Sequence, residues 1–152
     1  MPRAYVGLGA NLGEREQTLR RAVALLAAAD GVDVLAVSEL RKTDPVGVVD
    51  QPRFLNGAVA IETTLPPREL LDSLLRIERE LGRVRGEERW GPRTVDLDLL
   101  VYGDQIVGEP GLRVPHPRIH ERRFVLEPLA ELDPELEIPG LGRVSEVLAA
   151  LH

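Results

Sequence analysis

The sequence predicts an α+β fold: a ferredoxin-like βαββαβ antiparallel sheet with helices packed on it and C-terminal additions. The first observation is that segments of strand-like and helix-like apolar spacing follow one another in the order strand, helix, strand, strand, helix, strand. The second is that two split βαβ units in this order close an antiparallel sheet with both helices on one face. The length of 152 residues suits one domain, and we expect residues 1–152 to form it.

The first half of the pattern begins with a short apolar run at residues 4–9, which ends in glycines and predicts a strand. Apolar residues then recur at helical spacing over residues 19–29, and Gly31 follows where a helix C-terminal cap belongs. Residues 32–38 are rich in valine and predict the second strand. Residues 41–53 carry prolines, aspartates and glycine, which predicts a long loop that takes part in function.

The second half begins at residues 54–62, where polar and apolar side chains alternate as in a strand. A helix is expected to begin at Pro66 and Pro67 and to end before Gly82. Its apolar stripe consists of Leu70, Leu74, Ile77 and Leu81. Residues 94–102 start with β-branched side chains and continue as an apolar run, which predicts the fourth strand.

The pattern is weaker beyond residue 102. We expect a hairpin turn at residues 103–104 that leads into a strand at residues 105–107. Short helical segments are expected at residues 118–123, 129–132 and 147–151.

Composition excludes several classes of protein. The chain has no Cys, which excludes a disulfide scaffold, a thiolate metal site and a thiol nucleophile. No apolar run approaches the roughly 20 residues of a membrane helix, and the N-terminus lacks a secretory pattern, so we expect a cytoplasmic protein. The net charge of −6 argues against a protein that coats nucleic acid or anionic membranes.

Asp96 and Asp98 are the strongest sequence indication of a site. Residues two apart in a strand face the same side, so both carboxylates project together. The alternating positions are expected to enter the core: Val95, Leu97, Leu99 and Val101. Mg²⁺ binds one or two carboxylates with water and phosphate oxygens, and two such ions suit phosphoryl transfer. The pair alone leaves open a half-exposed strand with two surface aspartates.

The segment from Gly82 to Arg93 precedes this pair and holds four arginines, three glycines and the only Trp of the chain, Trp90. Arginines beside a carboxylate-metal centre bind phosphate oxygens and neutralise the charge that develops in the transition state. Glycines would let such a loop close over a substrate and expel water. A solvated loop with a Trp anchor is the alternative interpretation.

Phe54 and Asn56 share one face of the third predicted strand, where a ring and an amide suit a flat heterocycle. Phe124 is a candidate for a second ring wall, and His116, between two prolines, is a candidate donor to phosphate. Each of these residues also fits an ordinary structural role. Residues 7–13 match neither common glycine-rich phosphate motif, so we interpret them as a tight turn.

As a set, these motifs resemble the 6-hydroxymethyl-7,8-dihydropterin pyrophosphokinase family of folate biosynthesis. The resemblance rests on residues 54–58 (Phe-Leu-Asn-Gly-Ala), 89–98 (Arg-Trp-Gly-Pro-Arg-Thr-Val-Asp-Leu-Asp) and 115–118 (Pro-His-Pro-Arg). Residues 7–13 are similar to the family's first loop. The resemblance extends from about Ala4 to Asp133.

The resemblance implies that ATP, the co-substrate, donates its β,γ-pyrophosphoryl unit to the pterin hydroxymethyl group and leaves as AMP. It implies two Mg²⁺ ions held by Asp96 and Asp98. The implied pterin-binding residues are Thr43, Val46, Phe54, Asn56 and Phe124. The implied ATP-binding residues are Arg83, Arg85, Trp90, Arg93, His116 and Arg122. Arg83 and Arg93 join the two aspartates as the implied catalytic residues.

Three positions depart from the family pattern, namely Leu75, Gly86 and Pro117, and they bear on secondary ATP contacts and loop closure. Two alternatives without catalysis share the predicted order of elements: an RNA-binding module and a ligand-sensing module. An RNA-binding sheet needs exposed aromatics and a basic surface, which the acidic chain does not favour. We expect small-molecule partners, neither nucleic acid nor membrane, and a monomer, with an oligomer left open.

Overall fold

The computed structural model describes residues 2–10, 15–43, 54–84 and 95–151. Its helices and strands, in chain order, are β1 (Arg3–Ala10), α1 (Arg15–Ala27), β2 (Val32–Val37), β3 (Arg41–Thr43), β4 (Phe54–Thr63), α2 (Pro67–Val84), β5 (Asp96–Tyr102), β6 (Val107–Glu109), β7 (Leu112–Val114), η1 (Ile119–Glu121), α3 (Arg123–Leu132), β8 (Glu137–Ile138), β9 (Gly142–Arg143) and α4 (Val144–Ala149).

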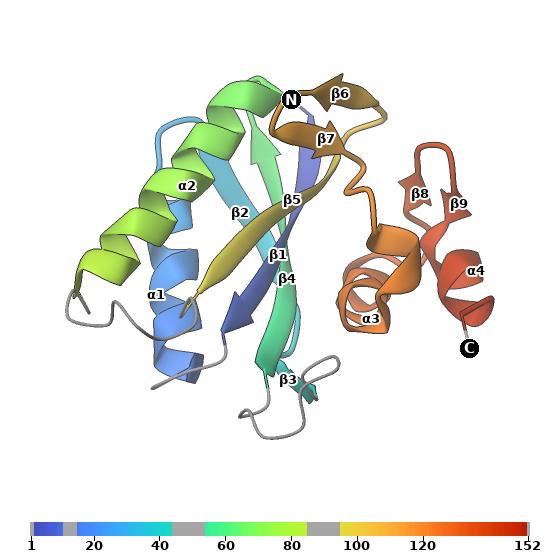
Figure 1. The fold of residues 1–152 in the computed structure, drawn as a ribbon, viewed down its shortest axis with the longest axis horizontal. Helices are drawn as coiled ribbons and strands as arrows, with labels where there is room; N and C mark the ends of the chain where they lie inside the picture. The colour runs from blue at the N-terminus through green and yellow to red at the C-terminus, as the bar shows by residue number, and fades with distance from the viewer. Residues whose placement is uncertain (1, 11–14, 44–53, 85–94, 152) are drawn as a thin grey trace.

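The central sheet has the strand order β2-β4-β1-β5, and all of its neighbouring strands are antiparallel. Helices α1 and α2 cover one face, while α3 and α4 lie on the other side (Figure 1). The predicted antiparallel sheet with two helices on one face is therefore confirmed. None of the helices in the described ranges is long and apolar enough to cross a membrane.

Two apolar cores hold the helices to the two faces of the sheet. The stripe predicted on α2 is buried in the first core, since Leu70 and Leu74 are fully covered. The second core joins Leu126 and Leu129 of α3 to small residues of β4, of which Ala58 is fully buried. Burial of each large aliphatic side chain contributes about 1.5–3 kcal/mol, so the two cores fix both helical layers on the sheet.

A β-bulge in β5 changes which core its later residues enter. Val6 of β1 pairs with Leu99 and Tyr5 pairs with Val101, so Leu100 is an extra residue on β5. The prediction that Val101 shares the face of Leu99 is therefore wrong. Val101 and Leu100 both belong to the second core, whereas Leu99 belongs to the first.

Several predicted boundaries need correction. Residues 41–43 were expected in a loop but form β3, because they pair in register with β4. The second helix continues past Gly82 to Val84, since one glycine costs a helix only about 1 kcal/mol relative to alanine. The strand that contains Val107 pairs with β7, not with β5.

The C-terminal helices also differ from the prediction. The segments expected at residues 118–123 and 129–132 are the short helix η1 followed by a continuous α3. The closing helix expected at residues 147–151 begins earlier, as α4. Residues 44–53 of the predicted loop lie outside the described residues.

The side chain of Thr63, at the end of β4, links the turn after α1 to the segment before α2. Thr63 is fully buried, and its hydroxyl donates a hydrogen bond of 2.7 Å to the carbonyl of Gly31. The same oxygen accepts a 2.9 Å hydrogen bond from the amide of Leu65, just before α2. The hydroxyl therefore satisfies two backbone groups at the junction of three elements.

We expect Thr63→Val to lower the free energy of unfolding by about 1–3 kcal/mol, because it preserves the shape but leaves the Leu65 amide without this partner, while the Gly31 carbonyl keeps only its bond from the Thr64 amide. The measurement is equilibrium urea unfolding. Thr64→Val is the matched control, since Thr64 is exposed, and should change the value by less than about 0.5 kcal/mol. Equal effects of the two substitutions would contradict this role of Thr63.

Candidate active site

Asp96 and Asp98 lie at the start of β5 with both side chains exposed, whereas Leu97 and Leu99 are buried. The buried residues belong to the core beneath α1 and α2, so alternation directs the two carboxylates toward the opposite, α3 side of the sheet. The predicted side-by-side arrangement of this pair is confirmed.

The glycines of β1 leave space beside these carboxylates. Gly9 pairs with Asn56 of β4 on one side and with Asp96 of β5 on the other, and Gly7 pairs with Asp98. A Cβ atom at Gly9 would approach the Asn56 Oδ1 atom to 3.2 Å. The absence of a side chain at Gly9 therefore keeps a hollow between the amide and the carboxylate.

The interpretation of residues 7–13 as a tight turn is wrong for its first part. Gly7 and Gly9 lie inside β1 and pair with strands on both sides, because the chain stays extended through Ala10. Residues 11–14 lie outside the described part of the chain.

Two pockets meet at the Asp pair. The first, which we call the Phe124 pocket, has a volume of about 410 Å³. Its lining includes Gly9, Asn56, Asp96, Asp98, Arg122 and Phe124. The second, the His116 pocket, has a volume of about 470 Å³. Its lining includes Leu75, Glu78, Asp96, Asp98, Arg113 and His116. Both carboxylates thus face two spaces, each large enough for a small ligand.

Glu78 of α2 fixes the backbone between the two aspartates. Its Oε2 atom accepts a 2.6 Å hydrogen bond from the amide of Leu97. The β5 strand is at the edge of the sheet, so this amide points away from β1 and needs a partner of another kind. Sequence reasoning missed Glu78, because the bond joins residues 19 positions apart and no local pattern reveals it.

Hydrogen bonds to the backbone of Leu100 and of Arg118 hold His116 in place. Its amide donates to the carbonyl of Leu100 at 2.9 Å, and the Arg118 amide donates to its Nδ1 atom at 3.2 Å. With Nδ1 as an acceptor, the neutral ring carries its proton on Nε2, as a donor. Burial lowers the pKa of His116, Asp98 opposes that shift, and Arg122 and Arg118 add to it.

Arg122 and Phe124 border the Phe124 pocket from the α3 side. The guanidinium carbon of Arg122 lies 5.7 Å from the centroid of the Phe124 ring, a cation–π contact. This contact fixes a flat apolar surface and a positive charge at one wall of the pocket. Asn56, which is 8% exposed, lines the same pocket from β4.

The remaining residues of the predicted site are described in part or not at all. Thr43 pairs with Phe54 where β3 meets β4, which places the backbone of both beside Asn56. Arg83 is placed only by its backbone in the last turn of α2. The other predicted residues, Val46, Arg85, Trp90 and Arg93, lie outside the described ranges.

Comparison with known proteins gives consistent results. The model of the 7,8-dihydro-6-hydroxymethylpterin-pyrophosphokinase (HPPK) family matches residues 5–134. A 2-amino-4-hydroxy-6-hydroxymethyldihydropteridine pyrophosphokinase of Bacillus subtilis is 54% identical over 134 residues, which cover 88% of this chain and 80% of that one. The enzyme of the same name from Pseudomonas aeruginosa is 47% identical over 148 residues, 97% of this chain and 91% of that one.

A solved structure shares the fold. A crystal structure of Plasmodium falciparum HPPK-DHPS superposes with a TM-score of 0.76 over 97% of this chain, at 15% sequence identity. The present chain spans 43% of that longer protein. At this identity the likeness concerns the arrangement of helices and strands.

The fold, the carboxylate pair between two pockets and the relatives together define a pyrophosphokinase, an enzyme of the diphosphotransferase class. The chain belongs to the 7,8-dihydro-6-hydroxymethylpterin-pyrophosphokinase family. Membership decides against the two alternatives without catalysis, the RNA-binding module and the ligand-sensing module.

The electrostatics of His116 give a prediction with a definite sign. In metal-free buffer with EDTA, we expect an NMR titration to give His116 a pKa below 6.5, because burial disfavours the charged ring. Asp98→Asn should lower the pKa further, since it removes the neighbouring negative charge. Arg122→Gln should raise it, since it removes a positive charge. A His116→Gln variant identifies the signal, and shifts of opposite sign would refute this description.

Proposed function

We propose that Asp96 and Asp98 form the reaction centre at which this enzyme transfers pyrophosphate from ATP to the hydroxymethyl group of 6-hydroxymethyl-7,8-dihydropterin. The family establishes this reaction in folate biosynthesis. The observation that carries the assignment of the centre is that the same two carboxylates line both pockets. A transfer between two bound substrates requires such a shared boundary, where the reacting groups meet.

The donor set at this centre fits Mg²⁺. Two exposed carboxylates on one strand face are hard oxygen donors, and Mg²⁺ typically takes one or two of them, with water and phosphates as its other ligands. Within the described ranges no cluster of three or more His, Asp or Glu side chains offers a complete metal site. We therefore assign two Mg²⁺ ions to Asp96, Asp98 and the phosphates of ATP. When bound, these ions would neutralise the charge of the phosphates.

We assign the pterin to the Phe124 pocket. The Phe124 ring supplies a stacking surface, and the Asn56 amide can both donate to and accept from the edge of a heterocycle. The hollow at Gly9 leads from Asn56 to Asp96, which would direct the hydroxymethyl group toward the carboxylates. From the resemblance, the proposal also assigns three further residues to pterin binding: Thr43, Val46 and Phe54.

We assign ATP to the His116 pocket and its junction with the Phe124 pocket. His116 Nε2 can donate to a phosphate oxygen, and Arg122 supplies a positive charge at the junction. The proposal includes four residues from the resemblance that bind the triphosphate, namely Arg83, Arg85, Trp90 and Arg93. Arg83 and Arg93 would act on the transferring phosphates.

In the reaction, the hydroxymethyl oxygen attacks the β-phosphorus of ATP. A new P–O bond forms as the bond between the β-phosphorus and the oxygen of the α-phosphate breaks, and AMP leaves with the electron pair of that bond. The hydroxyl proton passes to solvent. Catalysis of this kind depends on alignment and charge neutralisation more than on a covalent nucleophile, which agrees with a site of carboxylates, His and Arg.

The type of sheet, the extent of the domain and the oligomeric state are also proposals. The strand order β2-β4-β1-β5 around two βαβ units supports a ferredoxin-like sheet with C-terminal additions. We propose that residues 1–152 form one domain that acts as a monomer on small-molecule substrates, without nucleic acid or membrane partners. The cytoplasmic location stays a prediction from the sequence.

The direct test is release of AMP by the purified protein with Mg²⁺, ATP and 6-hydroxymethyl-7,8-dihydropterin. We expect Asp96→Asn and Asp98→Asn each to lower kcat by at least about 100-fold, because they remove charge that acts in the transition state. Asp33→Asn, an exposed strand aspartate on β2, should leave kcat unchanged. Wild-type turnover in either site variant with intact circular dichroism would overturn the assignment of the centre.

The hollow at Gly9 gives a second test. We expect Gly9→Ala to raise KM for the pterin about tenfold, because the new methyl group would approach Asn56 Oδ1 to 3.2 Å and occupy the gap. The substitution is measured by steady-state kinetics with ATP at saturation. Gly108→Ala is the matched control, since nothing lies within 4 Å of its Cβ position. An unchanged KM would show that the hollow takes no part in pterin binding.

A further inference from the structure

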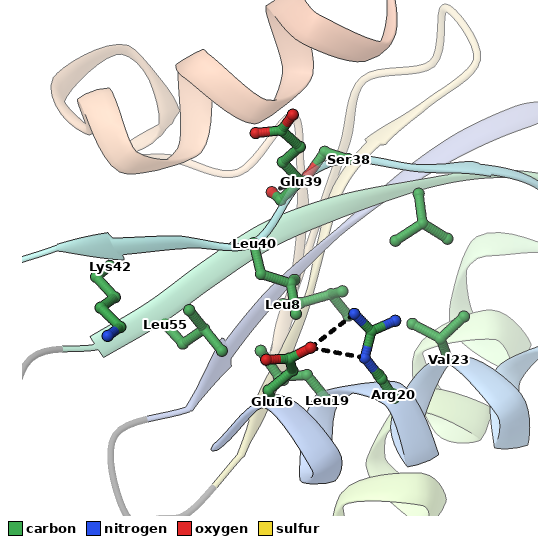
Figure 2. A pocket seen from close by; sticks show the side chains of 11 residues that line it. Leu8, Glu16, Leu19, Arg20, Val23, Ser38, Glu39, Leu40, Lys42 and Leu55 are labelled. Atoms are coloured by element: carbon green, nitrogen blue, oxygen red, sulfur yellow. Dashed lines mark hydrogen bonds and ion pairs between the residues drawn. The ribbon is translucent and has the colours of Figure 1, made fainter. Parts of the chain in front are cut away.

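A third pocket, of about 500 Å³, lies between α1 and the strands β1, β2, β3 and β4 (Figure 2). We call it the α1 pocket. Most of its wall is aliphatic: Leu8, Leu19, Val23, Val37, Leu40 and Leu55. A volume of this size with an apolar wall and a few polar groups is typical of sites for small molecules.

The α1 pocket is separated from the active site by the thickness of the sheet. Leu55 lines the α1 pocket, whereas the next residue, Asn56, lines the Phe124 pocket. Successive residues of β4 point to opposite faces, so the two pockets open on opposite sides of the same strand. The proposed reaction does not use the α1 pocket.

The rim of the α1 pocket, formed by Ser38, Glu39 and Leu40, is held in place by hydrogen bonds and packing. The Ser38 hydroxyl accepts from the Ala58 amide and donates to the Glu39 carbonyl, both at 2.9 Å. The Glu39 amide donates to the Glu131 carboxylate of α3 at 2.9 Å. Leu40 occupies the space beside Gly57, where a Cβ atom would approach its Cδ2 atom to 2.8 Å. The rim is therefore formed before any ligand binds, which lowers the entropic cost of binding.

The charges around the α1 pocket favour an anion. Glu16 neutralises Arg20 through two hydrogen bonds of 3.0 and 2.7 Å. Lys42 extends from β3 toward the α1 side, and no ion pair involves it among the described residues. The Glu39 side chain points away from the pocket, toward α3 (Figure 2). Among the described residues that line the pocket, the charge left without an ion pair inside it is therefore the ammonium group of Lys42.

We propose that the α1 pocket is a second ligand site, which binds a small amphipathic anion: an apolar ring system with one acidic group. The rings occupy the aliphatic wall, and the acidic group lies at Lys42. Burial of apolar ring surface supplies most of the affinity, and the ion pair sets the orientation. This proposal does not depend on the assignment of the reaction centre, because its test measures binding and not turnover.

The probe is 8-anilino-1-naphthalenesulfonate, an aromatic anion, titrated into protein with ¹³C-labelled Leu and Val methyl groups. We expect methyl shifts at Val23, Leu40 and Leu55, and none at Leu71 and Leu112 of the His116 pocket. Saturating Mg²⁺-ATP should not displace the probe. Shifts confined to the His116 or Phe124 pockets, or displacement by Mg²⁺-ATP, would overturn the proposal, as would the absence of saturable shifts.

The charge is tested by Lys42→Glu, which we expect to weaken binding of the probe about fivefold to tenfold, because attraction is replaced by repulsion. Arg21→Glu makes the same charge change at an exposed position on α1 outside the pocket and should leave the affinity unchanged. Equal weakening by the two substitutions would indicate only the effect of net charge, and would contradict a specific role of Lys42.

The position is tested by Val37→Glu against Leu35→Glu. Both residues are on β2 and are 43% exposed, but only Val37 lines the α1 pocket. Because both are already in contact with water, we expect both variants to fold. Val37→Glu should abolish the methyl shifts at Val23 and Leu40, whereas Leu35→Glu should preserve them. The reverse result, or no difference, would place the probe elsewhere.

Discussion

The pairing of β1 with β4 on one side and β5 on the other is the interaction on which the rest of the structure depends. This register places Gly9 between Asn56 and Asp96 and fixes which side chains share a face. Because β1 is central, its residues cannot shift by one position without moving the apolar set of every neighbour to the wrong face. The stability of the two cores therefore also maintains the geometry of the site.

The bulge at Leu100 divides the α3 face of β5 into a polar part and an apolar part. Asp96 and Asp98 are exposed at the start of the strand, and after them Leu100 and Val101 are both buried in the second core. Regular alternation would have sent Val101 to the opposite face. The bulge thus adds two residues of β5 to the core that α3 shares, and α3, which packs on β4, carries Phe124 to the pocket beside the carboxylates.

Local patterns were sufficient to predict the order of the main strands and helices, the stripe on α2 and the shared face of Asp96 and Asp98. These features depend on the spacing of apolar residues within one segment, and the burial of those residues in the cores confirms them. The bulge, the bond from Leu97 to Glu78 and the hollow at Gly9 depend on pairing between distant segments, which no periodicity in one segment reveals. The α1 pocket is of the same kind, because its wall combines a helix and four strands.

Negative charge at the edge of β5 explains why the proposed centre requires a cation. The carboxylates of Asp96, Asp98 and Glu78 all line the His116 pocket, and the hydrogen bond from the Leu97 amide fixes Glu78 beside the pair. Asp96 and Asp98 share one face of the same strand, so their like charges repel each other and the strand prevents them from separating. A bare triphosphate would add further negative charge, whereas its complex with Mg²⁺ brings compensating positive charge to the same place. Under the proposed assignment, the fixed carboxylates would therefore favour binding of the metal complex of the nucleotide over the free nucleotide.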